Sequence, residues 1–373
     1  MKFDPMKPAP PVTSINRASP KIECDRALLR RPLFYADRAF ACRLRALQTA
    51  TAASAMSKSV LLVKTSSLGD VIHALPAVSD MKAFAPDIEI EWVVEEPLVA
   101  IPRLHAGVAS VMPVAVRRWR RSFWQPAVRN EISAFIDRLR AKTYDVVIDA
   151  QGLFKSAAIT LGARGVRHGL DFHSAREPLG FFYQHSYRIG WNLHAVERNR
   201  MLVARALGYT LGTPCNYGIT AAPRSFDWLG SGAYAVLLHS TSGDYKLWPE
   251  AHWVALAEQL GTSGLRCVLT WGNPGERARS ERLASQMPGA VIAPALEFDA
   301  LAGLFAGARV VIGLDTGLTH LAAALGVATV GIYCGTDPAA TGIYGCPRAR
   351  NLGGIGKTPA VAEVVATVEA LIA

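Results

Sequence analysis

The sequence predicts an α/β protein in which two doubly wound parallel sheets face a common cleft. Its 373 residues, half of them hydrophobic, suffice for about two ordinary domains, each with its own core. From residue 59 onward, short apolar runs alternate with longer stretches of helical period, which is typical of parallel sheets covered by helices on both faces. The alternation pauses over residues 208–232, which are rich in Gly, Pro, Ser and Thr, and then resumes with a new strand.

The individual elements follow from these runs. Buried strands are predicted at residues 60–64, 88–94, 110–114, 145–150, 235–239, 267–271, 310–314 and 329–333. Helices are expected to begin after Asp70, near Glu131, at Phe154, near Ala195, and at Pro249, Pro274, Glu297 and Thr316, with a last helix in 359–373. We therefore expect an N-terminal domain at 56–215 and a C-terminal domain at 216–373, preceded by an extension at 1–55.

The extension differs in composition from the rest of the chain. It carries ten Lys and Arg against four Asp and Glu, and residues 24–47 form an arginine-rich amphipathic piece. One interpretation is a targeting or membrane-surface helix. The other, which we favour, is a leader outside the fold, disordered or upstream of the native start, because termini are often dispensable and Met56 directly precedes the first strand.

Composition narrows the class of protein further. No apolar run reaches the roughly 18 residues of a membrane span, so we expect a soluble protein. The six cysteines show no paired spacing, which suits reduced thiols in a cytosol. The net charge of +10 favours an anionic partner, but no nucleic-acid motif accompanies it, and we expect no nucleic acid.

The loop after the first strand, KTSSLGD (64–70), is the first candidate site, because ligands of such sheets bind beyond the carboxyl ends of the strands. Ser67, Gly69 and the following helix start offer backbone N–H groups to an anion or a sugar hydroxyl. Asp70 fits two roles, a general base at the cleft or a carboxylate that caps the helix. A helix N-terminus lowers a carboxylate pKa, so a base here would need partial burial to offset that effect.

A basic segment follows the third strand. RRWRRSFW contains Arg117, Arg118, Arg120 and Arg121 together with Trp119, Phe123 and Trp124. Arginine forks suit phosphate or carboxylate, and the aromatics suit a sugar face or a membrane interface, whereas the bland alternative is a solvated basic turn. Lys155, Arg167, His168 and Arg176 add positive charge to later loops of this half. The N-terminal half is therefore expected to take a polyanionic substrate.

The C-terminal half carries two loops suited to a diphosphate. Thr241, Ser242 and Lys246 precede a helix that begins at Pro249, as proline at a first helical position should. Trp248 and Trp253 are expected in the core. Glu276 either accepts hydrogen bonds from ribose or is an ordinary first-turn glutamate.

The second loop begins with Asp315, which ends a strand. Thr316 and Gly317 then open a helix, and Gly317 permits close approach of a phosphate. His320, one turn into this helix, is either a diphosphate contact or a packed histidine. The sequence has no HExxH, no DxD and no GxGxxG after a strand, and GGIGKT fails as a phosphate loop because Asn351 stands where its first glycine belongs. We therefore expect no metal and no cofactor.

Several segments resemble the lipopolysaccharide heptosyltransferases of type I in glycosyltransferase family 9. They include LLVKTSSLGDVIHALPA, WVVEE, PVAVRRWRR, YDVVIDAQGLFKSA, HGLDFHSAREPL, HAVERNR, KLWPEAHW and DTGLTHLAAAL, in order from about Val60 onward and not within 1–55. The resemblance implies the GT-B fold, with two Rossmann-like domains. It also implies inverting transfer of L-glycero-D-manno-heptose from ADP-L-glycero-β-D-manno-heptose to the first Kdo of Kdo2-lipid A.

The resemblance also implies roles for residues. It makes Asp70 the catalytic base, and it places Arg117, Arg118, Arg120, Arg121 and Arg176 at the anionic acceptor, with Ser67 and Gly69 beside them. It places Thr241, Ser242 and Lys246 at the diphosphate, Glu276 at the ribose, and Asp315, Thr316, Gly317 and His320 in the second donor loop. Ser242 departs from the family's Thr but keeps the hydroxyl, and Gly243 and Tyr245 replace more charged residues.

A lipid acceptor implies a place of action. We expect a cytoplasmic protein, peripheral at the inner leaflet of the inner membrane, with residues 117–121 and their aromatics as the contact. The alternatives are a type II or III heptosyltransferase, a related transferase with another nucleotide, and a non-catalytic module that kept the nucleotide site. Asp70 and the two intact donor loops argue against the last of these.

Overall fold

Two six-stranded sheets organise the computed structural model, which describes residues 58–373. All strand pairings in the first sheet are parallel, and the spatial order is β3–β2–β1–β4–β5–β6. These strands are β1 (Ser59–Val63), β2 (Glu89–Glu95), β3 (Ser110–Val114), β4 (Thr143–Asp149), β5 (Arg164–Leu170) and β6 (His185–Tyr187).

The second sheet repeats this arrangement. Its strands are also all parallel, in the order β12–β11–β10–β7–β8–β9. They are β7 (Tyr234–Leu238), β8 (Arg266–Leu269), β9 (Val291–Ile292), β10 (Val310–Leu314), β11 (Thr329–Tyr333) and β12 (Ala349–Gly353). Numbered within each sheet, both orders read 3-2-1-4-5-6, the doubly wound topology of nucleotide-binding sheets.

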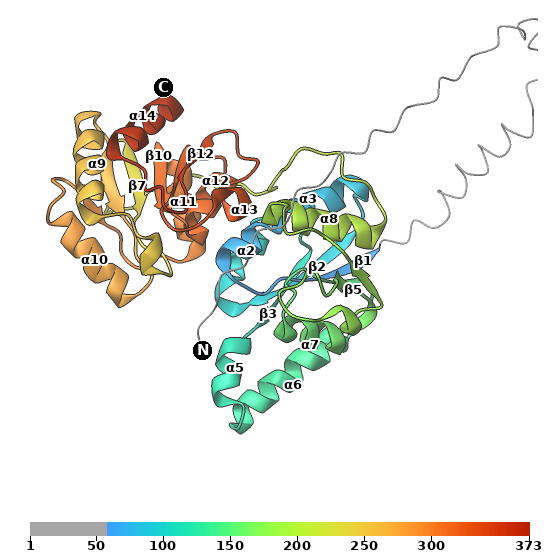
Figure 1. Cartoon of the computed structure of the whole chain (residues 1–373). Coiled ribbons are helices and arrows are strands. Elements are labelled where there is room, and N and C mark those ends of the chain that lie inside the picture. The colour runs from blue at the N-terminus through green and yellow to red at the C-terminus, as the bar shows by residue number, and fades with distance from the viewer. Residues whose placement is uncertain (1–57) are drawn as a thin grey trace, which may run out of the picture. The chain divides into compact units, whose positions relative to one another are not determined.

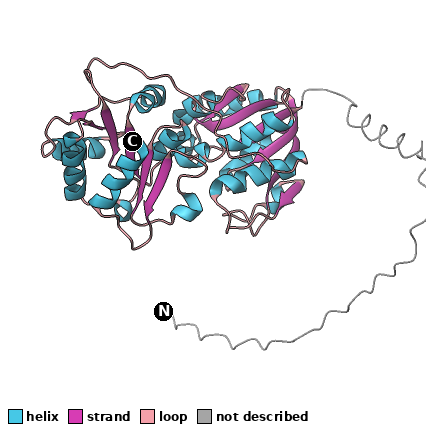
Figure 2. Ribbon diagram, turned by 90° about the horizontal axis from the view of Figure 1, so that it is seen from above, coloured by secondary structure: helices cyan, strands magenta, loops and turns pink. Residues whose placement is uncertain are grey.

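Helices cover both faces of each sheet (Figures 1 and 2). Those of the first half are α2 (Leu68–Ile72), α3 (Leu75–Phe84), α4 (Ala100–Arg103), α5 (Val116–Ser122), α6 (Pro126–Arg140), α7 (Phe154–Gly162) and α8 (Ala195–Leu207), with short 3-10 turns η1 (Glu96–Leu98) and η2 (Gly180–Phe182). Those of the second half are α9 (Glu250–Thr262), α10 (Pro274–Ala284), α11 (Phe298–Gly307), α12 (Gly317–Ala324), α13 (Pro338–Thr341) and α14 (Val361–Ile372), with η3 (Asp244–Lys246).

The topology decides where a ligand can bind. In each sheet the next two strands after the first are added on one side of it, and the last three are added on the other side. The strand order therefore reverses between β1 and β4 in the first sheet and between β7 and β10 in the second. At such a point the two following loops run to opposite sides and leave a crevice beyond the carboxyl ends of the strands. The loops after β1, β4, β7 and β10 are therefore the positions from which a site is built.

The apolar runs give the strands of the core. Central strands such as β7 and β10 are buried along their whole length, because helices shield both faces of a parallel sheet. Each of the eight predicted strands is present within two residues of its expected bounds, and Trp248 and Trp253 are fully buried as predicted. The sequence reading missed β5, β6, β9 and β12.

The missed strands share a physical cause. β6 and β12 are edge strands with mostly exposed residues, β9 has only two residues, and β5 is exposed over its first half. None of them carries the continuous apolar run that reveals a buried strand. The helix predicted to begin after Asp70 was also misplaced, since α2 begins at Leu68 and contains Asp70.

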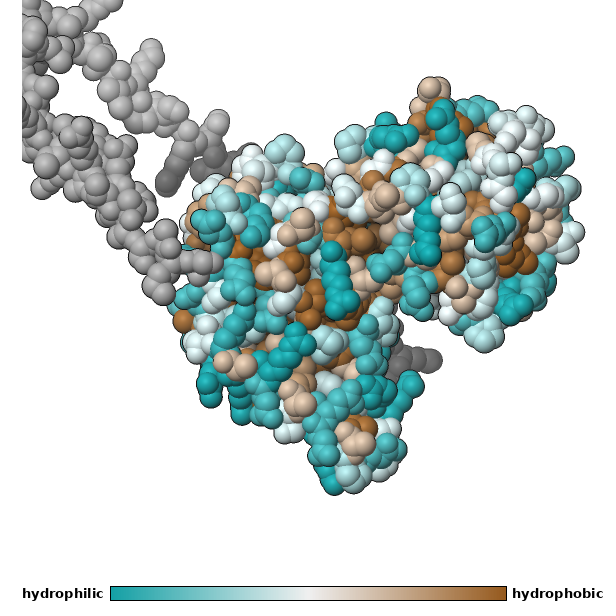
Figure 3. All heavy atoms as spheres, turned by 180° about the vertical axis from the view of Figure 1, so that it is seen from behind, coloured by the Kyte–Doolittle hydropathy of each residue, from teal (hydrophilic) through white to brown (hydrophobic). Residues whose placement is uncertain are grey.

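Three further expectations concern the chain as a whole. The predicted extension at 1–55 lies outside the described residues. Residues 58–373 belong to one compact unit, so the boundary proposed between 215 and 216 stays a prediction. No helix in this part of the chain is long and apolar enough to cross a bilayer. On the face shown in Figure 3, hydrophobic residues form separate patches among hydrophilic ones.

Candidate active site

Loops from both sheets line one cavity of about 410 Å³, within the usual range for a small-molecule site. It brings together most of the residues that the sequence singled out: Ser67, Gly69, Asp70, Arg176, Thr241, Ser242, Lys246, Asp315, Thr316, Gly317 and His320. A neighbouring cavity of about 570 Å³ shares Thr241, Ser242 and Thr316 with it and contains Glu276. Residues more than 250 positions apart in sequence, such as Ser67 and His320, thus border the same cavity.

Asp70 stands at the third position of α2 with its carboxylate toward the first cavity. Its Oδ2 accepts hydrogen bonds from the Ser67 backbone N–H at 2.9 Å and from Ser67 Oγ at 3.0 Å. Its Oδ1 lies 3.8 Å from Lys64 Nζ, and the side chain is 26% exposed. The carboxylate therefore closes the first turn of the helix and still faces the cavity, so the two roles considered for it are compatible.

The surroundings of Asp70 decide its protonation. Burial raises its pKa, but attraction to Lys64, the Ser67 backbone hydrogen bond and attraction to Arg176 outweigh burial, and the pKa lies below the usual aspartate value of 3.8. The rise in the Asp70 pKa that partial burial causes is therefore smaller than the lowering by its neighbours at the start of the helix. Asp70 is an ionised carboxylate at neutral pH, ready to accept a proton although a weak base.

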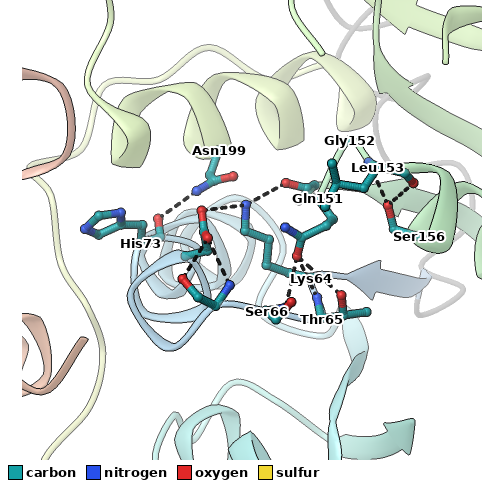
Figure 4. Close-up of polar contacts among 12 residues, drawn as sticks. Lys64, Thr65, Ser66, His73, Gln151, Gly152, Leu153, Ser156 and Asn199 are labelled. Atoms are coloured by element: carbon teal, nitrogen blue, oxygen red, sulfur yellow. Dashed lines mark hydrogen bonds and ion pairs between the residues drawn. The ribbon is translucent and has the colours of Figure 1, made fainter. Parts of the chain in front are cut away.

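Lys64 and Gln151 hold this loop in place (Figure 4). Lys64 is buried and donates from Nζ to the Ala150 carbonyl at 2.8 Å. Gln151 Oε1 accepts from the backbone N–H groups of Thr65 and Ser66, both at 3.0 Å. The loop after β4 thus fixes the loop after β1, and sequence reasoning did not single out Gln151 because its partners lie more than 80 residues away.

A smaller cavity of about 180 Å³ also has Asp70 in its lining. Arg176 and Arg198 border it, and the Arg198 guanidinium lies 3.5 Å from the ring centre of Trp191. Burial and the neighbouring Arg176 lower the pKa of Arg198, as expected where like charges meet. Two guanidinium groups and Lys64 beside one carboxylate suit an anionic group next to a hydroxyl.

Asp315 organises the opposite wall. Its Oδ2 accepts from Lys246 Nζ at 2.7 Å and from Thr336 Oγ1 at 2.8 Å, and its backbone carbonyl accepts from Thr241 Oγ1 at 2.7 Å. Burial raises the Asp315 pKa, but the hydrogen bonds from His320, Lys246 and Thr336 outweigh it and hold the pKa far below the usual range. An ionised Asp315 therefore fixes the Lys246 ammonium at the cavity.

Helix α12 begins beside this ion pair. Thr316 is its N-cap residue, and the first N–H groups of a helix have no partner within the helix, so they suit an anion. Lys246, the hydroxyls of Thr241 and Ser242, and this helix terminus line the same cavity, and together their chemistry suits a diphosphate.

The neighbouring cavity has the features of a nucleoside site. Leu296, Phe298, Leu301 and Leu318 supply apolar lining, with Glu276 at its polar side. Glu276 Oε2 accepts from the Gly272 backbone N–H at 2.7 Å, and its own N–H donates to Asn273 Oδ1 at 3.0 Å. Glu276 is both a first-turn glutamate of α10 and a cavity residue.

The two halves touch directly where α2 meets α12. A Cβ on Gly317 would lie 2.5 Å from Leu68 Cγ, and Gly69 faces the ring of His320. His320 Nδ1 lies 3.4 Å from Nε2 of the buried His73, which follows α2. The packing of α2 against α12 thus requires glycine at position 317. The sequence analysis explained Gly317 by the close approach of a phosphate alone and did not predict this contact.

Most of the arginine-rich segment forms α5, and among the described residues that line the three cavities none belongs to it. Burial and the nearby Arg117 and Arg120 lower the pKa of Lys155, and Lys155 also interacts with Asp70, so the predicted contact of this segment with the acceptor stays a prediction. Arg118 forms exposed ion pairs with Glu96 at 3.0 Å and Glu131 at 2.6 Å. Trp119 is buried against Phe135, so its predicted role as a sugar or membrane contact is wrong, whereas Phe123 and Trp124 are exposed.

Of the other basic residues predicted for this half, one contacts the Asp70 loop and others do not. Lys155 Nζ donates to Ser66 Oγ at 2.7 Å in the Asp70 loop. Arg167 donates to the Phe182 carbonyl, away from the cavity. Burial and the neighbouring His185 lower the pKa of His168 to about 4, so His168 is uncharged at neutral pH and the positive charge expected there is absent.

Other predicted absences concern ligands. GGIGKT begins at the last residue of β12 and ends three residues before α14 begins at Val361, so it does not form a helix-terminal phosphate loop. The residues described contain no group of three or more His, Cys, Asp or Glu side chains that could hold a metal ion.

Comparison with known proteins gives consistent matches. A model of glycosyltransferase family 9 (heptosyltransferase) matches residues 132–367. Lipopolysaccharide heptosyltransferase 1 of Escherichia coli K12 is 46% identical over 291 residues, covering 77% of this chain and 91% of that protein. The Pseudomonas aeruginosa protein of the same name is 47% identical over 290 residues, covering 77% and 81%. The solved structure of E. coli heptosyltransferase WaaC with ADP matches with a TM-score of 0.76 and 43% identity, covering 84% of this chain and 98% of that one.

Proposed function

Because the chain belongs to glycosyltransferase family 9, the heptosyltransferases, we propose that it transfers L-glycero-D-manno-heptose from ADP-heptose to the first Kdo of Kdo2-lipid A. The two Rossmann-like sheets make its fold GT-B, and it is a glycosyltransferase of lipopolysaccharide core synthesis. The observation that carries the specific proposal is one cavity with Asp70 on one wall and the diphosphate residues on the other.

The donor takes the second half of the molecule. ADP places its base in the apolar cavity with Glu276 at the ribose, and its diphosphate against Lys246, Thr241, Ser242 and the start of α12. The binding of ADP in the related WaaC structure supports this placement. Lys246 and the helix N–H groups stabilise charge that develops on the departing diphosphate, and they do so in positions already fixed by Asp315.

The acceptor takes the first half. Arg176, Arg198 and Lys64 attract the carboxylate of Kdo, which brings a hydroxyl to Asp70. The hydroxyl oxygen forms a bond to the anomeric carbon while the bond from that carbon to the diphosphate oxygen breaks. Asp70 receives the proton, ADP leaves with the electron pair, and the single displacement inverts the anomeric centre. The transition state is oxocarbenium-like, as in other inverting sugar transfers.

The lipid portion of the acceptor sets the place of action. We place the enzyme at the cytoplasmic face of the inner membrane, where ADP-heptose and the lipid-linked sugar meet. Arg117, Arg118, Arg120 and Arg121 are exposed on α5 and remain candidates for outer parts of the anionic acceptor, although Arg118 would have to exchange its weak surface ion pairs with Glu96 and Glu131 for that contact.

The test is turnover of ADP-heptose with Kdo2-lipid A by the full chain, read as product mass and anomeric configuration. Asp70→Asn should lower kcat by about 10²- to 10⁴-fold, the usual contribution of a general base, with ADP affinity by calorimetry nearly unchanged. Asp137→Asn, an exposed aspartate of α6, is the matched control and should behave as wild type.

Each rival has its own outcome. Transfer only to an already heptosylated acceptor would make the chain a type II or III enzyme, and transfer from another nucleotide sugar would change the donor. ADP binding without transfer to any acceptor would leave a non-catalytic module. Wild-type turnover by Asp70→Asn would remove Asp70 from the reaction.

A further inference from the structure

An aromatic surface stands beside the acceptor cavity. Phe154, Phe172 and Phe181 are 49%, 53% and 66% exposed, and with the half-buried Phe182 they form what we call the Phe cluster. Their rings are contiguous, since ring centres are 4.3 Å apart for Phe181 and Phe182, 6.0 Å for Phe172 and Phe181, and 6.1 Å for Phe154 and Phe182. Single exposed apolar residues are common, but a contiguous group marks an interaction surface.

The loop that carries this cluster is firmly held. It follows β5, and Tyr183 OH donates to the buried Asp149 at 2.8 Å while Ile189 N–H donates to Ser174 Oγ at 2.7 Å. Glu177 accepts from the Phe154 backbone N–H, which joins the start of α7 to the same loop. The outward rings of Phe172 and Phe181 contribute little to this anchoring, so the fold alone does not account for them.

The loop that carries the cluster also supplies residues to the acceptor cavity. Trp191 Nε1 donates to the carbonyl of His173, next to Phe172, at 2.9 Å, and Trp191 itself lines the cavity that contains Asp70. Arg176, in the same loop between Phe172 and Phe181, lines both cavities that meet at Asp70. A molecule with a polar anionic head in the cavity would therefore extend its remaining part over the Phe cluster.

The charge of the segment around the Phe cluster indicates which kind of molecule would lie over it. Residues 154–191 contain Lys155, Arg164, Arg167, Arg176 and Arg188 but only two acidic residues, Asp171 and Glu177. Both acidic side chains accept hydrogen bonds from backbone N–H groups of this region. Exposed aromatic rings in a segment of net positive charge match the boundary of an anionic bilayer, where rings lie at the acyl chains and cations at the headgroups.

We propose that the Phe cluster is the surface by which this protein docks on an anionic lipid bilayer, with the acceptor cavity opening onto the headgroups. The inference rests on the proposed function in taking the acceptor to be lipid-linked. It moves the membrane contact from α5, where the sequence suggested it, to the loop after β5. At α5, Phe123 and Trp124 form a separate exposed pair, with ring centres 5.4 Å apart.

The experiment measures sedimentation of the full chain with phosphatidylglycerol–phosphatidylethanolamine vesicles. Phe172→Ser/Phe181→Ser should lower the partition coefficient by about tenfold or more, since two exposed rings no longer enter the acyl boundary. Phe172→Leu/Phe181→Leu should restore most of it, and unchanged melting temperatures verify that the variants are folded. Raised salt should weaken binding of the wild type to these vesicles.

The matched control is Phe123→Ser/Trp124→Ser, which should bind as wild type. Unchanged binding by the Phe172/Phe181 double serine variant, or loss of binding only in the control, would overturn the proposal. A kinetic arm separates this inference from the function: the double serine variant should lose turnover on vesicle-embedded acceptor and keep it on the deacylated sugar acceptor. If the soluble acceptor is turned over but no vesicle binding occurs, the docking surface fails and the transferase assignment stands.

Discussion

Replacing Gly317 by alanine tests whether the contact between α2 and α12 aligns the reacting groups. The new Cβ would lie 2.5 Å from Leu68 Cγ and 2.7 Å from Leu68 Cβ and Cδ2. Ordinary carbon contacts are about 3.5 Å or more, so α2 must move by about 1 Å from α12. Leu68 and Asp70 are on the same short helix, so the displacement is transmitted to the Asp70 carboxylate, the proposed base.

A misplacement of about 1 Å costs up to about 10²-fold in the rate of a positioned reaction, and we expect that loss in kcat for Gly317→Ala. ADP affinity should change by less than about threefold, because the diphosphate residues remain together in the second half. Adding Leu68→Ala removes Cγ and Cδ2 from the contact but keeps Cβ at 2.7 Å, so it should recover only part of the rate. Gly261→Ala is the matched control, since no atom lies within 4 Å of a Cβ there.

The assay is steady-state turnover on the deacylated acceptor together with calorimetric titration of ADP. Two results would refute the reasoning. Wild-type kcat in Gly317→Ala would mean that α2 and α12 are not in this contact in the reacting complex. A weakened ADP affinity that Leu68→Ala does not rescue would mean that the glycine serves phosphate approach instead.

Three further predictions follow from the same structure. Asp80→Ala removes one of the two carboxylates that hold the buried Arg200 guanidinium, at 2.8 Å, while Glu197 stays at 2.7 Å, so it should lower the free energy of unfolding by about 2–3 kcal/mol, measured by urea titration, whereas a cost near zero would contradict a buried pair. Lys246→Ala should lower kcat and ADP affinity together, because the ammonium meets the diphosphate before and during its departure, and Lys246→Arg should recover part of both; unchanged kinetics would remove Lys246 from the donor site. The pKa of Asp70 is lowered, so the stability that its ionised form contributes is complete above the ordinary value of 3.8 and is lost as pH falls through its lower folded value. Because Asp70 stays ionised, kcat should be flat from about pH 8 down to about pH 5. A loss of kcat near pH 6 that disappears in Asp70→Asn would contradict this.

The sequence predicted the parts of this protein that local pattern determines. Apolar runs mark the central strands because a parallel strand buried on both faces must be apolar throughout. Strand-end loops then identify Asp70, Lys246, Asp315 and Glu276, since parallel strands bring their carboxyl ends to one edge whatever the sequence between them. The family resemblance added the roles of these residues.

Tertiary structure alone decided the contacts between distant segments. His73 meets His320 across 247 positions, Gln151 supports a loop about 85 positions away, and Gly317 packs on Leu68. No periodicity in the chain encodes these pairs, because they arise where separately folded layers meet. The same reason explains why Arg118 pairs with Glu96 and Glu131 and why the aromatic rings of one loop gather into a cluster. Composition records how many charges and rings a segment has, and packing decides which of them face one another.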